Sequence, residues 1–265
     1  MPHVVVGSEN GAEVSLYYED AGAGDPVVLI HGWPLSRRSW DSQVQTFVEA
    51  GHRVITYDRR GFGRSTHAWD GYDLDTFTAD LHTLVEHLGL TRVSLVGFSS
   101  GGGEVARYAA TFGTDRLHRI VLAGPVIGAD RQMAADLTIA SRRHRISMLD
   151  DLLTRFFSVD GESALDEPTR RYLLQAAADA SAKAVTDSIG AWSNAEPLAD
   201  LIRIDVPTLV VHGEQDAFMP YEAGGRQVAA AIAGSATVLI PSAPHGVPIT
   251  HHEQWNQAVL AFLND

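Results

Sequence analysis

Cysteine is absent from the chain, and lysine occurs only once, at Lys183. Without cysteine the protein can form no disulfide, offers no thiolate nucleophile and has no cysteine ligand for a metal. The sequence also has no apolar run long enough to span a bilayer, and its start lacks the charged, apolar and small-residue segments of a secretory leader. We therefore expect a cytoplasmic protein with no membrane-spanning helix.

Acidic residues dominate the charge of the chain. Asp and Glu number 33 against 20 for Lys and Arg, which gives a formal net charge of −13. Such a surface repels phosphates and anionic lipid headgroups, so we expect neither a nucleic acid nor a membrane as partner. The 265 residues, of which 45% are hydrophobic, are enough for one α/β domain with a substantial core.

The most informative stretch is Gly97-Phe98-Ser99-Ser100-Gly101. An apolar run, 93–96, precedes it and a helix-competent segment, 104–108, follows it. This order of strand, Gly-x-Ser-x-Gly turn and helix is typical of a nucleophile elbow. The turn forces Ser99 into a strained backbone conformation, and side chains at Gly97 and Gly101 would collide with the neighbouring backbone. We therefore predict that Ser99 is a nucleophile.

A serine hydroxyl needs a base, and the base needs an acid that orients it. The buried-type strand at 207–211 ends in a turn that carries both Glu214 and Asp216. Either carboxylate could be the acid; Asp216 is the preferred candidate because Glu214 lies against Gly213 and is expected to complete the turn. His245 follows the next strand, 237–240, and would meet Asp216 at one edge of a parallel sheet.

His245 is preferred among the histidines because its loop lies directly after a strand, between a proline and a glycine. His212 lies at the end of a strand and has the features of a core histidine. His251 and His252 belong to the expected first turn of the last helix. The predicted catalytic order is therefore serine, then aspartate, then histidine.

A second group of donors is expected after the early strand at 27–30, in the loop His31-Gly32-Trp33-Pro34. Glycine at position 32 lets the loop pass close to the nucleophile, and the backbone N–H of Trp33 is free to donate. We predict an oxyanion hole made of the backbone N–H groups of Trp33 and Ser100. Pro34 cannot donate, but it stiffens the loop through its fixed φ.

Five motifs in this order resemble the α/β-hydrolase family, and most of all its cofactor-free haloperoxidase, perhydrolase and aryl-esterase branch. They are the loop at 31–34, the run Tyr57-Asp58-Arg59-Arg60-Gly61-Phe62-Gly63-Arg64-Ser65, the elbow with its glycines to Glu104, His212-Gly213-Glu214-Gln215-Asp216, and Pro244-His245-Gly246. The resemblance implies a triad of Ser99, Asp216 and His245, with Trp33 and Ser100 as oxyanion donors. It implies no metal, nicotinamide or flavin.

The resemblance covers residues 14–125 and 200–263 and implies a mostly parallel eight-stranded sheet with helices on both faces. We expect a core formed by 1–126 and 196–265, with a helical cap inserted at 127–195. Roughly 70 residues in the middle of the chain have helical character and no strand-like alternation, which favours a cap over a separate domain. The expected strands are 14–19, 27–30, 53–57, 93–96, 118–122, 207–211 and 237–240, and the clearest helix is 75–88.

Aromatic residues of the cap and of the loops beside the triad are candidates for a substrate pocket, and packing of the cap onto the core is the alternative. They are Phe98, Phe156, Phe157, Tyr172, Trp192 and Phe218.

Two charged groups are interpreted as structural. Asp58 and Arg59 are expected to form an ion pair at a turn. Arg142, Arg143 and Arg145 fit one solvated helix face better than a binding site for an anionic substrate.

These features predict a serine hydrolase that cleaves small-molecule carboxylic esters through an acyl-enzyme. Lactone, amide or carbon–carbon bond hydrolysis on the same triad is the alternative, and a ligand-binding receptor that retains the triad is the alternative from another class. Hydrogen peroxide could replace water at the acyl-enzyme and give a peracid. Pro34 motivates this side activity, because its fixed φ is expected to bring the Trp33 carbonyl near the attacking peroxide. A homo-oligomer is left open.

Overall fold

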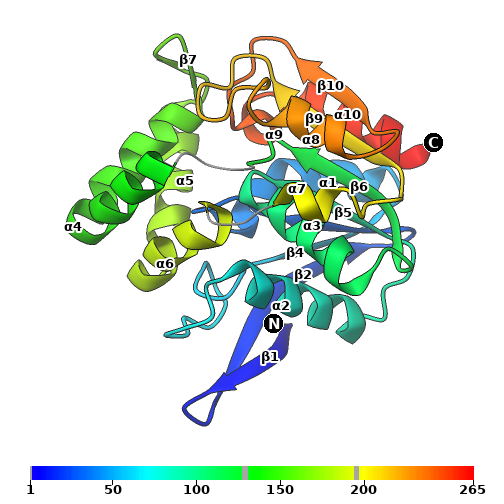
Figure 1. Ribbon diagram of the computed structural model, residues 1–265, viewed down its shortest axis with the longest axis horizontal. Coiled ribbons are helices and arrows are strands. Elements are labelled where there is room, and N and C mark those ends of the chain that lie inside the picture. Colours follow the sequence, from blue (N-terminus) through cyan, green and yellow to red (C-terminus); the bar gives the residue numbers. More distant parts are fainter. Residues whose placement is uncertain (1, 127–130, 194–196) are drawn as a thin grey trace.

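The computed structural model describes residues 2–126, 131–193 and 197–265. Eight strands of these residues form one sheet in the order β1-β2-β4-β3-β5-β6-β9-β10 (Figure 1). β2 pairs antiparallel with β1 and β4, and every other neighbouring pair is parallel. The mostly parallel eight-stranded sheet is thus confirmed. Its strands are β1 (His3–Glu9), β2 (Ala12–Gly22), β3 (Pro26–Ile30), β4 (Arg53–Tyr57), β5 (Val93–Phe98), β6 (Leu117–Ala123), β9 (Thr208–Gly213) and β10 (Ala236–Ile240).

Helices cover both faces of the sheet because both faces of its central strands are apolar. Val27 and Leu29 of β3 pack into one core cluster, with Phe47 and Trp255, whereas Val28 lies in the cluster on the opposite face. Helices α1 and α10 belong to the first cluster, and α2, α3 and α8 belong to the second. The helices are α1 (Asp41–Glu49), α2 (Leu74–His87), α3 (Ser100–Phe112), α4 (Arg131–Phe156), α5 (Glu167–Ala178), α6 (Ala182–Ser193), α7 (Pro197–Leu201), α8 (Gly225–Ala231), α9 (Val247–Thr250) and α10 (His252–Asn264), with a 3₁₀ turn at Arg37–Trp40.

The register of the sheet brings the loops of interest together. β5 lies between β3 and β6, and Ile30 at the end of β3 is paired with Gly97 of β5. Ile240 at the end of β10 is likewise paired with Gly213 at the end of β9. Because these strands are parallel, the loops that follow β3, β5, β9 and β10 all leave the same edge of the sheet.

The expected strands agree with the observed ones to within a few residues, but two elements were not anticipated. The first is β1, which pairs with the early strand β2. The second is a short hairpin of β7 (Ser158–Val159) and β8 (Glu162–Ser163) in the segment expected to be wholly helical. Asp160 and Gly161 join its strands, both with positive φ, so an Asp-Gly turn signal explains this hairpin.

Helices α4, α5 and α6 gather at one end of the molecule, beside the sheet rather than against its strands (Figure 1). We propose that they form the cap, and that residues 1–126 and 196–265 form the core. The ends of this insertion, 127–130 and 194–196, lie outside the described residues. Inside α4, His144 has non-helical angles (φ −144°, ψ 51°) and breaks the helix in two. The Ser141 and Thr186 hydroxyls, 2.9 Å apart, join α4 to α6.

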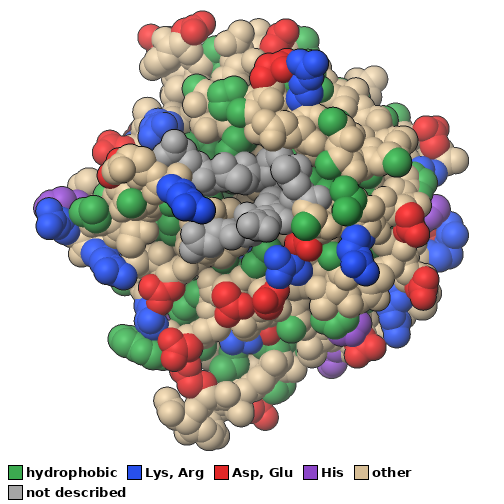
Figure 2. Space-filling view, in the orientation of Figure 1, with side chains coloured by type: hydrophobic (Ala, Val, Ile, Leu, Met, Phe, Trp, Pro, Cys, Tyr) green, Lys and Arg blue, Asp and Glu red, His purple; other side chains and the backbone are tan. Residues whose placement is uncertain are grey.

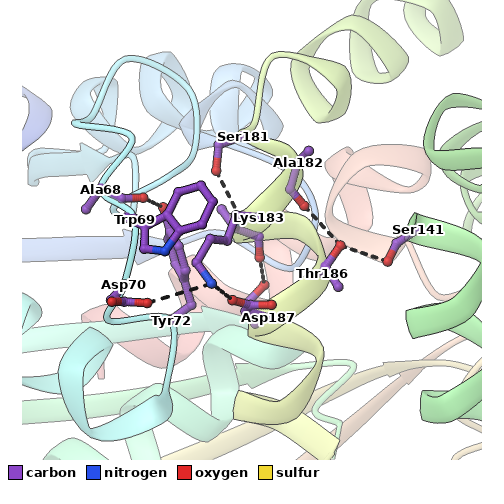
Figure 3. Close-up of polar contacts among 12 residues, drawn as sticks. Ala68, Trp69, Asp70, Tyr72, Ser141, Ser181, Ala182, Lys183, Thr186 and Asp187 are labelled. Carbon is purple, nitrogen blue, oxygen red and sulfur yellow. Dashed lines mark hydrogen bonds and ion pairs between the residues drawn. The ribbon is translucent and has the colours of Figure 1, made fainter. Parts of the chain in front are cut away.

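The only lysine of the chain ties the proposed cap to a loop of the core. Figure 3 shows the Lys183 side chain of α6 beside the indole of Trp69, with its ammonium between Asp70 and Asp187. Its Nζ lies 3.7 Å from a carboxylate oxygen of Asp70, 2.5 Å from one of Asp187 and 4.9 Å from the centre of the Trp69 ring. Lys183 therefore bridges two elements that are more than 100 residues apart in the sequence.

Charges of both signs are mixed on the face of the molecule that Figure 2 shows. Figure 2 shows Lys and Arg side chains interspersed with Asp and Glu over the face in view. Among the described residues, no helix is both long and apolar enough to cross a membrane.

The expected ion pair between Asp58 and Arg59 is wrong. Asp58 instead accepts the backbone N–H groups of Arg37, at 2.8 Å, and Arg64, at 2.9 Å. The Arg59 guanidinium points to Glu104 of α3, with 2.5 Å between Nε and the carboxylate, and the Tyr57 hydroxyl donates to the same carboxylate. Asp58 and Arg59 are neighbours on a turn, but their side chains have different partners. The sequence alone does not show that Arg59 pairs with Glu104, 45 residues further along the chain.

The other arginines of interest lie in α4. Arg142 and Arg143 are exposed, in agreement with a solvated face. Arg145 is half-buried and donates to the carbonyl oxygens of Ala178 and Ala180, so it fastens α4 to the end of α5.

The buried Arg59–Glu104 pair yields the first prediction. Replacing the carboxylate in Glu104→Gln leaves the Arg59 charge buried without a counter-ion, so we expect the free energy of unfolding to fall by about 3–5 kcal/mol. Urea denaturation measures this value. Glu222→Gln is the matched control, because Glu222 pairs with Arg226 on the open surface, with 69% of its side chain exposed. Equal midpoint shifts in the two variants would contradict the importance of burial.

Candidate active site

Ser99 occupies a sharp turn between β5 and α3. Its backbone has φ +53° and ψ −118°, a conformation that non-glycine residues rarely adopt. The turn is held by the Ser99 N–H, which donates to the Ala123 carbonyl at 2.8 Å, and by the Gly102 N–H, which donates to the Ser99 carbonyl at 3.0 Å. The strained conformation expected from the sequence is present.

Glycines on both sides of this turn are required by close backbone contacts. A Cβ atom at Gly97 would lie 2.5 Å from the carbonyl oxygen of Gly101, and one at Gly101 would lie 2.6 Å from that of Ile30. A Cβ atom at Gly32 would lie 3.1 Å from the Cβ of Ser99. The first residues of α3 and the loop after β3 therefore both pass against the turn that carries Ser99.

The three residues proposed as a triad converge at this edge of the sheet. His245 Nε2 lies 2.9 Å from Ser99 Oγ, and His245 Nδ1 lies 2.7 Å from Asp216 Oδ2. All three side chains are buried. The arrangement lets the imidazole accept the hydroxyl proton on one nitrogen while the carboxylate holds the other nitrogen protonated.

The Asp216 carboxylate is fixed by more than His245. Its Oδ1 accepts the backbone N–H groups of Phe218, at 2.9 Å, and Met219, at 2.7 Å. His212 Nε2 lies 3.2 Å from Oδ2 and 2.8 Å from the Met219 carbonyl. Burial raises the pKa of Asp216, but the charge of His245 and the hydrogen bonds of His212 and His245 outweigh burial and hold this pKa well below its ordinary value. Asp216 is therefore ionised at neutral pH.

The rival candidates lie elsewhere. Glu214 is exposed, and its backbone N–H donates to the Ile240 carbonyl. His251 and His252 lie where α9 gives way to α10, at the start of the last helix as expected. His212 is a core histidine, as expected, but nothing in the sequence indicates that it contacts Asp216.

The loop after β3 brings Trp33 to the start of α3. The Trp33 backbone N–H, expected to be free, donates to the Ser100 hydroxyl oxygen at 2.9 Å. Ser100 begins α3, so its own N–H has no partner within the helix. The two residues predicted as backbone donors are thus in contact, and the Ser100 hydroxyl takes the hydrogen bond of the Trp33 N–H.

His31 holds this loop in place through two hydrogen bonds of its ring. Its Nε2 accepts the Arg59 backbone N–H at 3.1 Å, so the proton is assigned to Nδ1, which donates to the Gly32 carbonyl at 3.0 Å. Burial, together with the charge of Arg59, holds the pKa of His31 well below its ordinary value. A neutral imidazole with one fixed tautomer therefore holds the Gly32–Trp33 peptide in place.

Aromatic rings enclose His245. The ring centres of Phe98, Phe156 and Phe218 lie 5.4, 4.7 and 4.9 Å from that of the imidazole. They come from β5, from the end of α4 and from the loop after β9, so three distant segments exclude water from one side of the proton-transfer pair. These were candidates for a pocket wall, and their contact with the base was not predicted.

The remaining aromatic candidates have different surroundings. Phe157 is buried against Gly246, where a Cβ atom would lie only 2.1 Å from its ring. Trp192 of α6 packs on Trp33, with 5.5 Å between ring centres. Tyr172 does not lie in a buried pocket wall. The residue is 40% exposed, and its hydroxyl donates to Asp41 because α5 packs toward the 3₁₀ turn before α1.

Comparisons with known proteins agree with this geometry. A sequence profile of the α/β hydrolase fold matches residues 25–252. The chain belongs to the α/β-hydrolase family. It is 35% identical to a bifunctional esterase/perhydrolase of Acinetobacter calcoaceticus, over 94% of this chain and 96% of that one, and 36% identical to a non-heme chloroperoxidase of Kitasatospora aureofaciens, over 95% and 96%. The crystal structure of a bromoperoxidase from Bacillus anthracis superposes with a TM-score of 0.96, at 45% identity, over 100% of this chain and 99% of that one.

The part of this α/β hydrolase that the structure describes shows no set of side chains suited to bind a metal ion. Residues 2–126, 131–193 and 197–265 contain no cluster of three His, Asp or Glu side chains arranged to hold a metal ion.

The second prediction separates the two acids of the loop after β9. In Asp216→Asn, the amide oxygen keeps the N–H groups of Phe218 and Met219, so the NH₂ group faces His245 Nδ1 and disfavours the required tautomer. We expect kcat to fall by about 10⁴-fold while the fold persists.

Glu214→Gln is the matched control and should leave kcat within about twofold of wild type, since the Glu214 side chain is exposed. Ester turnover and far-UV circular dichroism of both variants give the measurement. A severe Glu214→Gln variant beside a mild Asp216→Asn variant would refute the assignment.

Proposed function

We propose that this α/β hydrolase cleaves small-molecule carboxylic esters through an acyl-enzyme on Ser99. The observation that carries the proposal is the hydrogen-bonded series in which His245 lies 2.9 Å from the Ser99 hydroxyl and 2.7 Å from Asp216. This series joins a strained, buried serine to a base with a fixed partner. Such an arrangement activates an alcohol for attack on a carbonyl.

Each residue of the series has a defined part in the proposed reaction. His245 Nε2 takes the Ser99 proton as Oγ attacks the ester carbonyl, and Asp216 stabilises the imidazolium that forms. The tetrahedral oxyanion is stabilised by donors at the start of α3 and in the loop after β3, from Ser100 and Trp33. His245 then protonates the leaving alcohol, and water, activated by the same imidazole, releases the acid.

The aromatic residues support an ester with an apolar acyl or aryl group. Phe98, Phe156, Phe157, Phe218 and Trp192 are the proposed pocket residues, and all are buried around His245, Gly246 or Trp33. The name of one relative, a bifunctional esterase/perhydrolase, supports ester cleavage as the reaction. A cytoplasmic location and a homo-oligomeric assembly are retained as proposals.

The third prediction tests the nucleophile. Ser99→Ala removes the attacking oxygen, so we expect aryl-ester turnover to fall by about 10⁴-fold or more, with the fold intact. A fluorophosphonate should label the wild type at Ser99 and at no other serine, as peptide mass spectrometry would show. Labelling at Ser100, or near-wild-type turnover by Ser99→Ala, would refute the proposal.

Pre-steady-state kinetics distinguishes this proposal from the alternatives. A burst of phenolate, stoichiometric with enzyme, is expected when the protein is mixed with an aryl ester. Saturable ligand binding without a burst would favour a receptor that retains the triad. A panel that adds lactones and amides would identify either as the preferred substrate if its kcat/KM exceeds that of the esters.

The fourth prediction concerns peroxide as the second nucleophile. Attack of hydrogen peroxide on an acetyl-enzyme gives peracetic acid, which oxidises bromide without a redox cofactor. We expect peroxide-dependent bromination of a dye in acetate buffer, its loss in Ser99→Ala, and a much lower rate in a buffer without a carboxylic acid.

The role of Pro34 in this reaction stays a prediction. Pro34→Leu should lower the ratio of perhydrolysis to hydrolysis if the loop aids peroxide attack. An unchanged ratio would remove that role, and bromination that survives Ser99→Ala would refute the acyl-enzyme route.

A further inference from the structure

The Trp33 N–H of the oxyanion loop is already engaged. It donates to Ser100 Oγ at 2.9 Å, across 67 residues of sequence. Ser100 directly follows the nucleophile and begins α3. The Ser100 hydroxyl therefore takes the hydrogen bond that the Trp33 N–H would otherwise donate to a substrate oxygen.

The peptide that carries the Trp33 N–H cannot easily turn away. Its carbonyl oxygen, on Gly32, accepts from His31 Nδ1 at 3.0 Å and from the Leu35 N–H at 2.9 Å. Rotation of this peptide would break both bonds inside a buried loop, at a cost of about 1–3 kcal/mol for each group left unsatisfied. The N–H therefore remains aimed at Ser100.

The Ser100 hydroxyl has one proton of its own to donate. Its oxygen accepts from Trp33, and within the described part of the chain no acceptor for its own proton is seen. The cavity beside it has a volume of about 20 Å³ and is lined by Trp33, Glu104, Ser188 and Trp192. A hydroxyl that accepts a hydrogen bond becomes a better donor, because neighbouring hydrogen bonds polarise one another.

We propose that the Ser100 hydroxyl, polarised by the Trp33 N–H, donates to the oxyanion together with the Ser100 N–H, so that Trp33 acts on the oxyanion through this hydroxyl. In the proposed geometry one oxygen accepts from both the N–H and the hydroxyl of Ser100, at the start of α3. The hydroxyl keeps its own proton throughout and donates a hydrogen bond that strengthens as negative charge develops. Ser100 thereby acts through its side chain as well as its backbone. The inference rests on the proposed ester hydrolysis.

Two variants of Ser100 and one control test this role. Ser100→Ala removes the hydroxyl and should lower kcat for an aryl acetate by about 10²-fold, with KM within about threefold, since a donor to the oxyanion acts mainly in the transition state. Ser100→Thr keeps the hydroxyl and should restore kcat to within about tenfold of wild type. Ser188→Ala should leave both constants unchanged, because Ser188 lines the same cavity but donates to Ala184 in its own helix.

Affinity for an aryl trifluoromethyl ketone gives a second readout, because its adduct with Ser99 carries the oxyanion. Ser100→Ala should weaken this inhibitor by about the same factor as it lowers kcat, and Ser100→Thr should recover the affinity. A Ser100→Ala enzyme with unchanged or higher kcat would show that the hydroxyl only fills the hole, and would overturn the inference.

The failure of this inference is distinct from failure of the proposed function. Wild-type labelling at Ser99 and the phenolate burst test the ester hydrolase without reference to Ser100. If Ser100→Ala misfolds, judged by circular dichroism, the decision falls to Ser100→Cys, which keeps the size of the side chain but is a weak donor. A loss of kcat in Ser100→Cys that Ser100→Thr does not share supports the role, and equal kcat values in the two variants overturn it.

Discussion

The whole site depends on a close contact between two backbone segments. The start of α3 passes so near β3 and β5 that no side chain fits at Gly97 or Gly101, where a Cβ atom would lie 2.5 and 2.6 Å from a carbonyl oxygen. This contact forces the intervening Ser99 to a positive φ and brings the start of α3 beside the loop after β3, where Trp33 donates to the Ser100 hydroxyl. The strain at Ser99 persists because β3, β5 and β6 are hydrogen-bonded around it in the middle of the sheet.

Around this fixed turn, the charges and protons are held by groups that cannot easily change state. Asp216 is anchored by two backbone N–H groups and stays ionised, because its neighbours hold its pKa low. His31 stays neutral, because burial and Arg59 hold its pKa low, and it orients the Trp33 N–H. His245 lies between Asp216 and Ser99, and in the proposed mechanism it carries the proton of Ser99. The groups around His245 are thus held in place before the reaction, and in the proposed mechanism the proton between Ser99 and His245 is the one that moves.

The sequence predicts the core of this fold well because its strands are short apolar runs bounded by glycine and proline, and β4 is predicted to the residue. The proximity of Ser99, Asp216 and His245 also follows, since each comes after a parallel strand. The sequence does not show which side chains meet when their residues are far apart in the chain, because this depends on the direction in which each side chain points. The sequence places Arg59 beside Asp58, although its partner is Glu104, and it does not show that the Ser100 hydroxyl accepts from Trp33.

The proposed cap reaches the site from two sides. Phe156, at the end of α4, lies 4.7 Å from His245, and Trp192, in α6, lies 5.5 Å from Trp33. The same helices that would enclose a substrate therefore also pack against the base and against the oxyanion loop. Under the proposed mechanism, a change in cap sequence that selects a different acyl group must keep these two contacts, since loss of the first would disturb the base and loss of the second the loop that carries Trp33. This coupling limits how far substrate range can change while the core remains constant.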